Sequence, residues 1–417
     1  MAEELDAPAI RSRFPGLSRR QEGRPCVFAD APGGTQAPET VIQAMAGYLR
    51  TSNANAGGAF ETSRATDELI AAARLAAADL VGCDPDEVAF GPNMTALSFS
   101  LSRAIGRTLR PGDEVVVTAL DHDANISPWL LAARDVGAKV RWVEVAPEDC
   151  TLDLASLETA LGPRTRVVAF TLASNAVGTI TPAIEIVRRA HEVGALAVAD
   201  AVHFAPHRAI DVRALDADVL YCSPYKFFGP HLGVMFGKRA QLAEWEPYKV
   251  RPASDGVPER WESGTLNHEG LAGFVAAVDY LAGLAPPRGT SPAGHSRRAL
   301  LERGFSAIRA HETALSEGFL KGLPNGVRLY GIGDAARVDE RVPTFALRVE
   351  GVGPRELAEE LARRGVFVWD GNYYAQAIME RLGLEDSGGA TRVGFCHYTT
   401  PDEVDRVLDE IGRIARG

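Results

Sequence analysis

Short apolar runs alternate with longer amphipathic stretches between residues 85 and 240 of the chain. The longer stretches, at 127–137, 154–162 and 182–194, carry apolar residues three and four positions apart and a glycine near their end, which is typical of surface helices. Near-continuous apolar strands between such helices predict an α/β fold with a mostly parallel sheet covered on both faces. The predicted strands are 114–120, 140–145, 165–174, 195–200, 218–223 and 232–237.

The rest of the chain predicts more helices and a second domain. Helical patterns occupy 38–50, 64–81, 268–283 and 297–321, and a stretch rich in Pro, Gly and Ser at 283–296 marks a domain boundary. Beyond it, strands at 327–330, 343–349, 366–369 and 391–395, with helices at 354–365 and from Pro401, predict a smaller α+β domain. We expect an N-terminal segment (1–30) that packs with the small domain, a large domain (31–286) and a small C-terminal domain (287–417).

Composition narrows the classes of partner and compartment. The chain is 46% hydrophobic and 24% charged, and its 44 basic and 55 acidic residues give a net charge of −11 without a long basic run, so we expect no nucleic-acid partner. The sequence has no signal-peptide pattern and no uninterrupted apolar stretch of membrane-spanning length, so we expect a cytoplasmic protein that binds no membrane. Five scattered cysteines without a CxxC pair predict neither a disulfide framework nor a zinc site.

Polar residues follow several of the predicted strands. Because ligands of such sheets bind at the carboxyl ends of the strands, these residues are expected to meet in one crevice, although each alone could cap a helix or make a turn. They are Asp121, His122, Ser174, Asn175, Asp200, His203, Ser223 and Lys226.

This set of side chains suits one kind of cofactor chemistry. A lysine in a partly apolar pocket, here Lys226, loses its proton readily and becomes a nucleophile for an aldehyde. A carboxylate such as Asp200 can hold a heterocyclic nitrogen protonated, and the pair is typical of pyridoxal phosphate enzymes. Gly229 and Gly233 would let a cofactor approach the backbone. Asn93, Met94 and Thr95 open a helix after the strand at 88–90, where an anionic phosphate could bind, unless Asn93 or Thr95 is only a helix cap.

The sequence resembles the class V aminotransferase superfamily of fold-type I pyridoxal phosphate enzymes, and within it the cysteine desulfurase and selenocysteine lyase branch. The resemblance covers nearly the whole chain and implies an aspartate-aminotransferase-like large domain with a seven-stranded sheet that binds pyridoxal 5'-phosphate. The motifs that carry it are FADAPGGTQAPE (28–39), DHDANISPW (121–129), SNAVGT (174–179), ADAVHFAPHRAIDV (199–212), SPYKFFGPHLG (223–233), WESGTLNHEG (261–270) and YTTPDEVDRVLDEI (398–411).

The resemblance implies a role for each matching residue around the cofactor ring. Lys226 would carry the cofactor covalently and later move protons, Asp200 would pair with the pyridine nitrogen, and His122 would stack on the ring. His203, where much of the family has glutamine, and Asn175 would lie near the ring hydroxyl and the substrate amine.

The resemblance also implies a phosphate site and a substrate clamp. Met94, through its backbone N–H, would bind the phosphate together with Thr95, Ser223 and Tyr225, the last replacing a histidine common in the family. Thr265 would reach the phosphate of a partner subunit in a homodimer. Arg392 would clamp the carboxylate of an amino-acid substrate, since a guanidinium binds carboxylates in a bidentate manner.

One position departs from the desulfurase pattern. Desulfurases carry a cysteine nucleophile on a small-domain loop, which here is WDGNYYAQAIMERLG (369–383) with Tyr374 at the aligned position; the nearest cysteine is Cys396. The segment 52–60 also lacks the His-Arg pair often found there. Because tyrosine cannot form a persulfide, we expect a β-elimination reaction that breaks a C–S or C–Se bond. The alternatives are an aminotransferase or amino-acid epimerase, a true cysteine desulfurase, and a non-catalytic scaffold that has kept the fold.

Two other kinds of site are weaker readings of the sequence. Gly331, Gly333 and Ala336 spell a GxGxxA pattern, but the following apolar run is a strand, where a nicotinamide-binding fingerprint needs a helix. His203 and His207 could join Asp200 in a metal site, but the spacing of the histidines requires a helix that Pro206 interrupts. A non-catalytic scaffold would need none of Lys226, Asp200, His122 and Arg392, so the presence of all four argues against that alternative.

Overall fold

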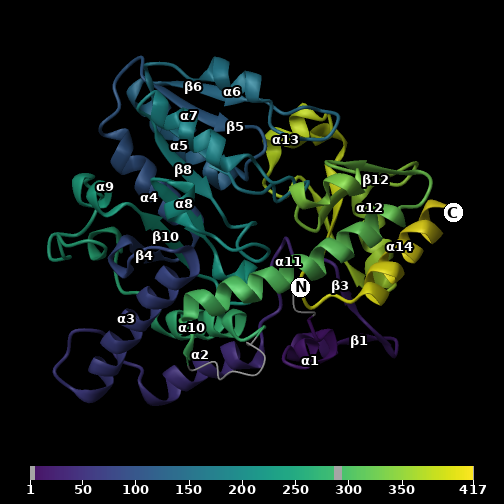
Figure 1. The fold of residues 1–417 in the computed structure, drawn as a ribbon, viewed down its shortest axis with the longest axis horizontal. Coiled ribbons are helices and arrows are strands. Elements are labelled where there is room, and N and C mark those ends of the chain that lie inside the picture. Colours follow the sequence, from purple (N-terminus) through teal and green to yellow (C-terminus); the bar gives the residue numbers. More distant parts are fainter. Residues whose placement is uncertain (1–4, 286–293, 417) are drawn as a thin grey trace.

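A computed structural model describes residues 5–285 and 294–416 of the chain. Figure 1 shows a large sheet with its helices on one side of the molecule and a smaller sheet, with α12 and α14, on the other. The predicted boundary stretch, 283–296, falls partly outside the described residues. The domain limits given above therefore stay a prediction.

The central sheet has seven strands and is mostly parallel, as the sequence predicts. β10 is antiparallel to both of its neighbours, and the other pairs of adjacent strands are parallel. The order is β4 (Val88–Gly91), β10 (Gly233–Gly237), β9 (Val219–Cys222), β8 (Leu196–Asp200), β7 (Thr165–Thr171), β5 (Glu114–Thr118) and β6 (Lys139–Val143). The inner strands β5, β8, β9 and β10 are almost wholly buried, whereas the edge strand β6 alternates between exposed and half-buried positions. This difference explains why the inner strands read as continuous apolar runs.

Helices pack on the sheet where the periodic pattern places them. α4 (Met94–Gly106) packs against β10 and α5 (Ser127–Val136), and α7 (Ala183–Glu192) packs against β8. α5 has Pro128 in its first turn and ends at Gly137, whose φ of 74° is the left-handed conformation that glycine adopts readily. The other helices of this part are α2 (Glu39–Thr51), α3 (Glu61–Val81), α6 (Leu154–Ala160), α8 (Val212–Leu215), α9 (Arg239–Glu244) and α10 (His268–Ala282).

The second sheet is small and antiparallel. Its order is β11 (Val327–Tyr330), β12 (Thr344–Val349), β15 (Ala390–Gly394) and β14 (Trp369–Gly371). The single strand predicted at 366–369 is in fact two: β13 (Val366–Phe367) leaves the sheet and pairs in parallel with β3 (Val27–Phe28). The helices of this part are α11 (Arg297–Lys321), α12 (Pro354–Arg363), α13 (Gln376–Arg381) and α14 (Pro401–Ala415).

The N-terminal segment lies against the second sheet and its helices. Besides the β3–β13 pair, Arg11 at the end of α1 (Ala7–Arg11) donates to the carbonyl of Tyr398 at 2.8 Å and pairs with Glu403 at 2.7 Å. The short strands β1 (Arg20–Gln21) and β2 (Arg24–Pro25) form a hairpin between α1 and β3. Val27 and Ala29 also belong to the hydrophobic cluster of the small sheet. The segment that follows β3 reaches the turn after β9, where the Thr35 N–H donates to the Tyr225 carbonyl at 3.1 Å.

The GxGxxA pattern does not lie in a dinucleotide-binding unit. A short 3₁₀ helix (Ala335–Glu340) follows β11, and the next strand, β12, runs antiparallel to β11. A dinucleotide-binding fingerprint requires two parallel strands joined by a helix. The GxGxxA pattern is therefore not such a fingerprint. Among the described helices, none has the length and apolar character needed to cross a membrane.

Candidate active site

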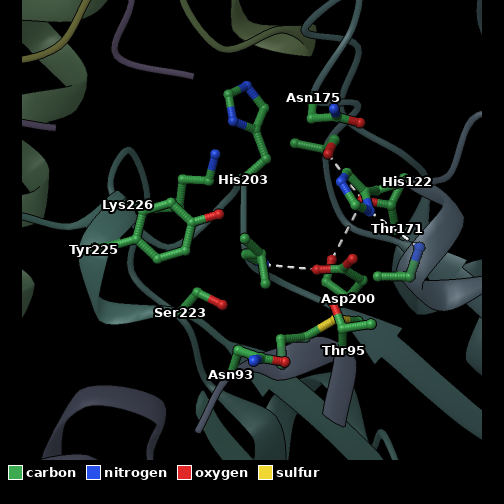
Figure 2. A pocket seen from close by; sticks show the side chains of 14 residues that line it. Asn93, Thr95, His122, Thr171, Asn175, Asp200, His203, Ser223, Tyr225 and Lys226 are labelled. Atoms are coloured by element: carbon green, nitrogen blue, oxygen red, sulfur yellow. Dashed lines mark hydrogen bonds between the residues drawn. The ribbon is translucent and has the colours of Figure 1, made fainter. Parts of the chain in front are cut away.

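A pocket opens at the carboxyl ends of β5, β7, β8 and β9, where the sequence predicts the site. Figure 2 shows Lys226 and Tyr225 on one side of it and His122 and Asn175 on the other. Nine of the predicted site residues line this pocket: Met94, Thr95, His122, Asn175, Asp200, His203, Ser223, Tyr225 and Lys226. Arg392 and Tyr374 line a second, outer cavity that shares Lys226 and His122 with the first. Thr265 is exposed in the loop before α10 and lines neither cavity of the single chain.

Lys226 is a buried amine. It ends a short 3₁₀ turn (Pro224–Lys226) after β9, and its Nζ donates to the carbonyl of Pro32. Burial, together with the positive charge of Arg392, lowers the pKa of Lys226 to about 7, although Asp200 and Asp30 oppose the shift. At neutral pH a substantial fraction of this lysine is therefore uncharged and nucleophilic.

Asp200 ends β8 at the floor of the pocket. The side chain is 3% exposed, and its Oδ1 accepts a hydrogen bond from the Val202 N–H at 2.8 Å. Burial raises the pKa of Asp200 to about 6, while that hydrogen bond and Lys226 hold it down. A cationic partner stabilises the charged form of a buried carboxyl, and a protonated ring nitrogen would supply one.

His122 follows β5 and caps a 3₁₀ turn (Asp123–Asn125). Its Nδ1 accepts from the Ala124 N–H at 3.0 Å, so the proton of the neutral ring lies on Nε2. Burial, Lys226 and Arg392 lower the pKa of His122 to about 4, so the ring is neutral at physiological pH. A neutral imidazole is suited to stacking and not to carrying charge.

Asp121 is predicted from the sequence as one of the strand-end residues of the site. It lies beneath the turn at Asp123–Asn125 and outside the pocket. It is fully buried and accepts hydrogen bonds from Thr118 Oγ1, Asn125 Nδ2 at 2.7 Å and the Thr171 N–H at 3.0 Å. Burial raises the pKa of Asp121 to about 8. Asp121 thus fixes the turn that presents His122, and Ser174 likewise makes only local bonds to the N–H groups of the turn after β7.

Two buried polar atoms at the pocket have no partner among the described residues: Nδ1 of His203 and Oδ1 of Asn175. The other side of each group is fixed, since His203 Nε2 bonds with Thr344 Oγ1 at 2.9 Å and Asn175 Nδ2 donates to the Tyr373 carbonyl at 3.0 Å. Burial lowers the pKa of His203 well below its usual range. Buried polar atoms are rarely left unpaired, so these two indicate a polar ligand.

The beginning of α4 forms the opposite end of the pocket. Asn93 is a helix cap, as one reading of the sequence predicts, because its Oδ1 accepts from the Ala96 N–H at 2.8 Å. The N–H groups of Met94 and Thr95 remain at the helix start, where an anion is favoured. Ser223 lies beside them, and Tyr225 is held by stacking on His231 with ring centroids 4.8 Å apart.

The glycines after Lys226 do not serve the purpose that the sequence suggests. A side chain at Gly233 would collide with the backbone of Asn93, and one at Gly229 would collide with Pro224. Neither glycine lines either cavity. They allow β10 and the turn of Lys226 to approach neighbouring backbone, and so affect the pocket only through its shape.

Arg392 lies on β15 and faces the outer cavity. The residue is 4% exposed, its Nη1 donates to the Asn175 carbonyl at 2.8 Å, and its buried Nε has no partner among the described residues. Burial lowers the pKa of Arg392 to about 10, which leaves it charged at neutral pH. A buried guanidinium with donors to spare is suited to a carboxylate.

The loop that carries Tyr374 also supports Arg392. Tyr373 and Tyr374 both have left-handed backbones, with φ of 55° and 58°, which are rare for residues other than glycine. The guanidinium of Arg392 lies 4.3 Å from the ring centroid of Tyr373, whose hydroxyl donates to the Ala390 carbonyl. Tyr374 stacks on His122, and its carbonyl accepts from the Asp123 N–H at 2.6 Å.

Sequence reasoning missed three contributors to the site. Tyr373 and Pro32 act through the contacts already described, and Asp30 lies close enough to Lys226 and Arg392 for their charges to act on it. Burial raises the pKa of Asp30 to about 6, and its buried Oδ1 has no partner among the described residues. The signal for Asp30 and Pro32 is the motif FADAPGG, which includes both; nothing in the sequence marks Tyr373.

The histidines of the rejected metal reading have protein partners. His203 bonds with Thr344, and His207 Nδ1 bonds with the buried Glu312 at 2.9 Å. In the described residues no group of three or more His, Cys, Asp or Glu side chains could hold a metal ion. The centroids of the two rings lie 5.4 Å apart, edge to face, so the imidazole of His207 packs against that of His203.

The side chains present fit pyridoxal phosphate. A partly neutral lysine, a buried carboxylate, a neutral imidazole and two unpaired polar atoms surround one pocket that ends at a helix N-terminus. These are the donors and acceptors that an aldehyde, a pyridine nitrogen, a ring hydroxyl and a phosphate require.

Comparisons with known proteins define the class. The family model "Aminotransferase class-V" matches residues 27–286 and 294–407, so the chain belongs to the class V aminotransferase family. It is 32% identical over 410 residues to an uncharacterized protein of Mycobacterium tuberculosis, covering 98% of this chain and 99% of that one. It is 31% identical to a probable cysteine desulfurase of Streptomyces coelicolor, over 98% and 97% of the two chains. It is 32% identical to a cysteine desulfurase of Synechococcus elongatus, of which it spans 64%.

Solved structures agree on the fold. The cysteine desulfurase of Thermococcus onnurineus superposes with a TM-score of 0.87 over 100% of both chains at 24% identity. A cysteine desulfurase of Escherichia coli gives a TM-score of 0.82 over 99% of both chains, also at 24% identity. The family consists of pyridoxal-phosphate-dependent enzymes, and the resemblance stated from the motifs is confirmed. The chain is an enzyme of this class.

Proposed function

We propose that the enzyme binds pyridoxal phosphate at Lys226 and catalyses β-elimination from an α-amino acid that carries sulfur or selenium on its β-carbon. The observation that carries the proposal is the absence of a thiol at the site. All five cysteines lie in the described part of the chain, and none lines either cavity. The nearest in sequence to Tyr374, Cys396, is buried, and burial raises the pKa of its thiol well above the usual range. Sulfur transfer to a protein thiol therefore has no acceptor here.

The residues of the pocket divide the work of the reaction. Arg392 would hold the substrate carboxylate, and its Nε and Nη2 are the donors not already used on Asn175. Asp200 would hold the pyridine nitrogen, His122 would lie against the ring, and His203 and Asn175 would supply their unpaired atoms to the ring hydroxyl and the substrate amine. The N–H groups of Met94 and Thr95, with Ser223 and Tyr225, would hold the phosphate.

Lys226 is the proposed base. Pyridoxal phosphate, when bound, delocalises the negative charge left at the α-carbon after proton loss. The amine of Lys226, with its pKa lowered to about 7, is suited to take that proton near neutral pH. The C–S bond then breaks and the thiolate leaves with a proton. Overall, one thioether and one water give a thiol, pyruvate and ammonium.

True cysteine desulfurase activity is the second candidate, because several relatives carry that name. It requires a persulfide acceptor outside this chain, since Tyr374 stands at the aligned position. Aminotransferase and epimerase reactions begin with the same proton removal, and no side chain at the pocket favours them.

We also propose a cytoplasmic homodimer. Thr265 is exposed and outside its own cavities, and the start of its loop is fixed by Glu262, which pairs with Arg74 at 2.8 Å. Thr265 would thus be available to a partner's phosphate. The cysteines are all free, as expected for a reducing compartment. Mixing the Lys226→Ala and Thr265→Ala variants tests the shared site: mixed dimers should regain activity in one of their two sites, whereas independent monomers should not.

Reduction with borohydride tests the cofactor site. Holoenzyme treated with borohydride should lose its yellow colour and yield one peptide whose Lys226 carries the reduced cofactor, and Lys226→Ala should give no such peptide. Untreated holoenzyme should form pyruvate from cysteine sulfoxides, selenocysteine or thioethers. Labelling at another lysine, or exchange of amino groups with 2-oxo acids without pyruvate, would contradict the proposal.

A further inference from the structure

The outer cavity begins where the substrate is anchored and is larger than cysteine requires. Its volume is about 780 Å³, and its walls include both Lys226 and Arg392. The cavity is therefore the space open to the side chain of an amino acid whose carboxylate binds Arg392 and whose α-carbon faces Lys226. A volume of this size is typical of pockets for ligands well above the size of cysteine.

The wall of the outer cavity is rich in aromatic side chains. Phe99 of α4, Trp369 of β14 and Tyr374 of the following loop all line it. Trp369 is 51% exposed and Tyr374 is 74% exposed. Neither the Trp369 indole N–H nor the Tyr374 hydroxyl has a hydrogen-bond partner among the described residues. Large exposed rings beside a pocket are typical of a binding surface.

The neighbouring backbone holds these rings in place. A side chain at Gly33 would overlap the Trp369 indole, so the ring lies directly on the backbone of the segment that also carries Pro32. Tyr374 is held by its stack on His122 and by the hydrogen bond from Asp123. The aromatic surface is therefore attached to both walls of the cavity.

The carboxylates of the outer cavity are already engaged. Asp123 accepts from Ser127 Oγ at 2.6 Å, and Asp370 pairs with Arg355 at 3.2 Å. A cationic substrate side chain would have to compete with these partners. An aromatic or bulky apolar group does not need to displace these partners, and it is stabilised by burying apolar surface against the aromatic rings.

We propose that the substrate is a thioether of cysteine whose sulfur carries an aromatic or similarly bulky apolar group, and that Phe99, Trp369 and Tyr374 bind this group. The inference rests on the proposed β-elimination. In the reaction the Cα–H and Cβ–S bonds break, the sulfur leaves as an aryl thiol with one proton, and water releases the remaining carbon skeleton as pyruvate and ammonium. No oxidant, reductant or protein thiol takes part.

Paired substrates test the inference on the holoenzyme. S-phenyl-L-cysteine and S-methyl-L-cysteine are compared by pyruvate release, and L-homophenylalanine and L-norvaline, which have a methylene in place of sulfur, are compared by equilibrium binding. L-homophenylalanine should bind at least about tenfold more tightly than L-norvaline, the usual gain from an aromatic group in an aromatic site. S-phenyl-L-cysteine should release pyruvate faster than S-methyl-L-cysteine by at least the same factor, since its thiolate is also the better leaving group. Trp369→Ala should reduce both ratios several-fold, and the matched control Leu75→Ala, an exposed apolar residue outside the cavities, should leave them unchanged.

The two kinds of readout separate the inference from the reaction on which it rests. Pyruvate release without a preference for the phenyl compounds would overturn the aromatic site and leave the β-elimination standing. Tight binding of L-homophenylalanine, lost in Trp369→Ala, without pyruvate from any thioether would support the aromatic site and overturn the β-elimination. Equal binding of homophenylalanine and norvaline would overturn the aromatic site whatever the products are.

Discussion

The phenol ring of Tyr374 lies nearly parallel to the imidazole of His122, with ring centroids 5.6 Å apart and ring planes inclined by 23°. The two residues are far apart in the sequence, and the hydrogen bond from Asp123 to the Tyr374 carbonyl joins the same two segments. The loop position that the motif resemblance aligns with the desulfurase cysteine is thus attached to a histidine of the pocket. Tyr374 supports the site through its ring.

Two replacements of Tyr374 should separate the contribution of its ring from that of its hydroxyl. Tyr374→Phe keeps the stack and should retain kcat/KM for pyruvate formation from S-methyl-L-cysteine within about twofold, since the hydroxyl has no partner among the described residues. Tyr374→Ala should lower it about fivefold, because a ring stack contributes on the order of 1 kcal/mol. A Phe variant as inactive as the Ala variant would mean that the hydroxyl takes part in the reaction.

Arg392→Lys should raise KM for the amino acid about 100-fold and change kcat less. A lysine ammonium cannot make the bidentate pair with a carboxylate, and it also loses the contact with the Tyr373 ring. Arg328→Lys, at another residue that lies over a tyrosine ring, is the matched control and should leave KM unchanged. Equal KM values in wild type and Arg392→Lys would contradict the proposal that Arg392 binds the substrate carboxylate.

The lowered pKa of Lys226 should be visible by competitive acetylation of the apoprotein. The rate of acetylation should rise through a midpoint near pH 7, because burial disfavours the charged ammonium and the proton is lost earlier than usual. Lys238 is an internal reference: burial opposes the shift, but hydrogen bonds to Asp216 and Asp218 raise its pKa, so its midpoint should lie several pH units higher. Equal midpoints for the two lysines would contradict the electrostatic account of the pocket.

The same shift predicts how the stability of the apoprotein depends on pH. The folded pKa of Lys226, about 7, lies below its usual value of 10.5, so the unfolded chain binds more protons between these limits and Lys226 contributes stability that rises with pH. Below about pH 7 Lys226 is charged in both the folded and the unfolded chain, and the full cost of burying its charge lowers the free energy of unfolding. Lys226→Met should therefore be more stable than wild type by a few kcal/mol at pH 7, with the difference shrinking towards pH 10, as measured by urea unfolding. A difference that grows with pH would have the wrong sign.

Much of the fold and of the inner pocket follows from the sequence because the relevant signals are local. Continuous apolar runs mark buried parallel strands, and the polar residues directly after them meet at one edge, which brings Lys226, Asp200, His122 and Asn175 together. The same reasoning fails where the partner is remote. Lys226 bonds to Pro32, 194 positions away, and Asn175 bonds to Tyr373, 198 positions away.

The errors of the sequence reading have physical causes as well. The run 366–369 divides into two strands because its first half pairs with β3, a contact that no local pattern records. Gly229 and Gly233 make room for backbone, which a glycine-rich turn signals as readily as a ligand site. The strained pair Tyr373 and Tyr374 bears no signal at all, since neither is a residue that favours a left-handed backbone.

The products formed from L-cysteine test the central claim most directly. Holoenzyme and cysteine, analysed in one sample for pyruvate, alanine, sulfide and protein-bound persulfide, should give pyruvate and sulfide in equal amounts, however slowly, with no alanine and no persulfide. Lys226→Ala should give none of these products. Alanine formed together with a persulfide on the protein would contradict the account, because it would mean that this chain transfers sulfur to a thiol despite having Tyr374 where the desulfurase cysteine stands.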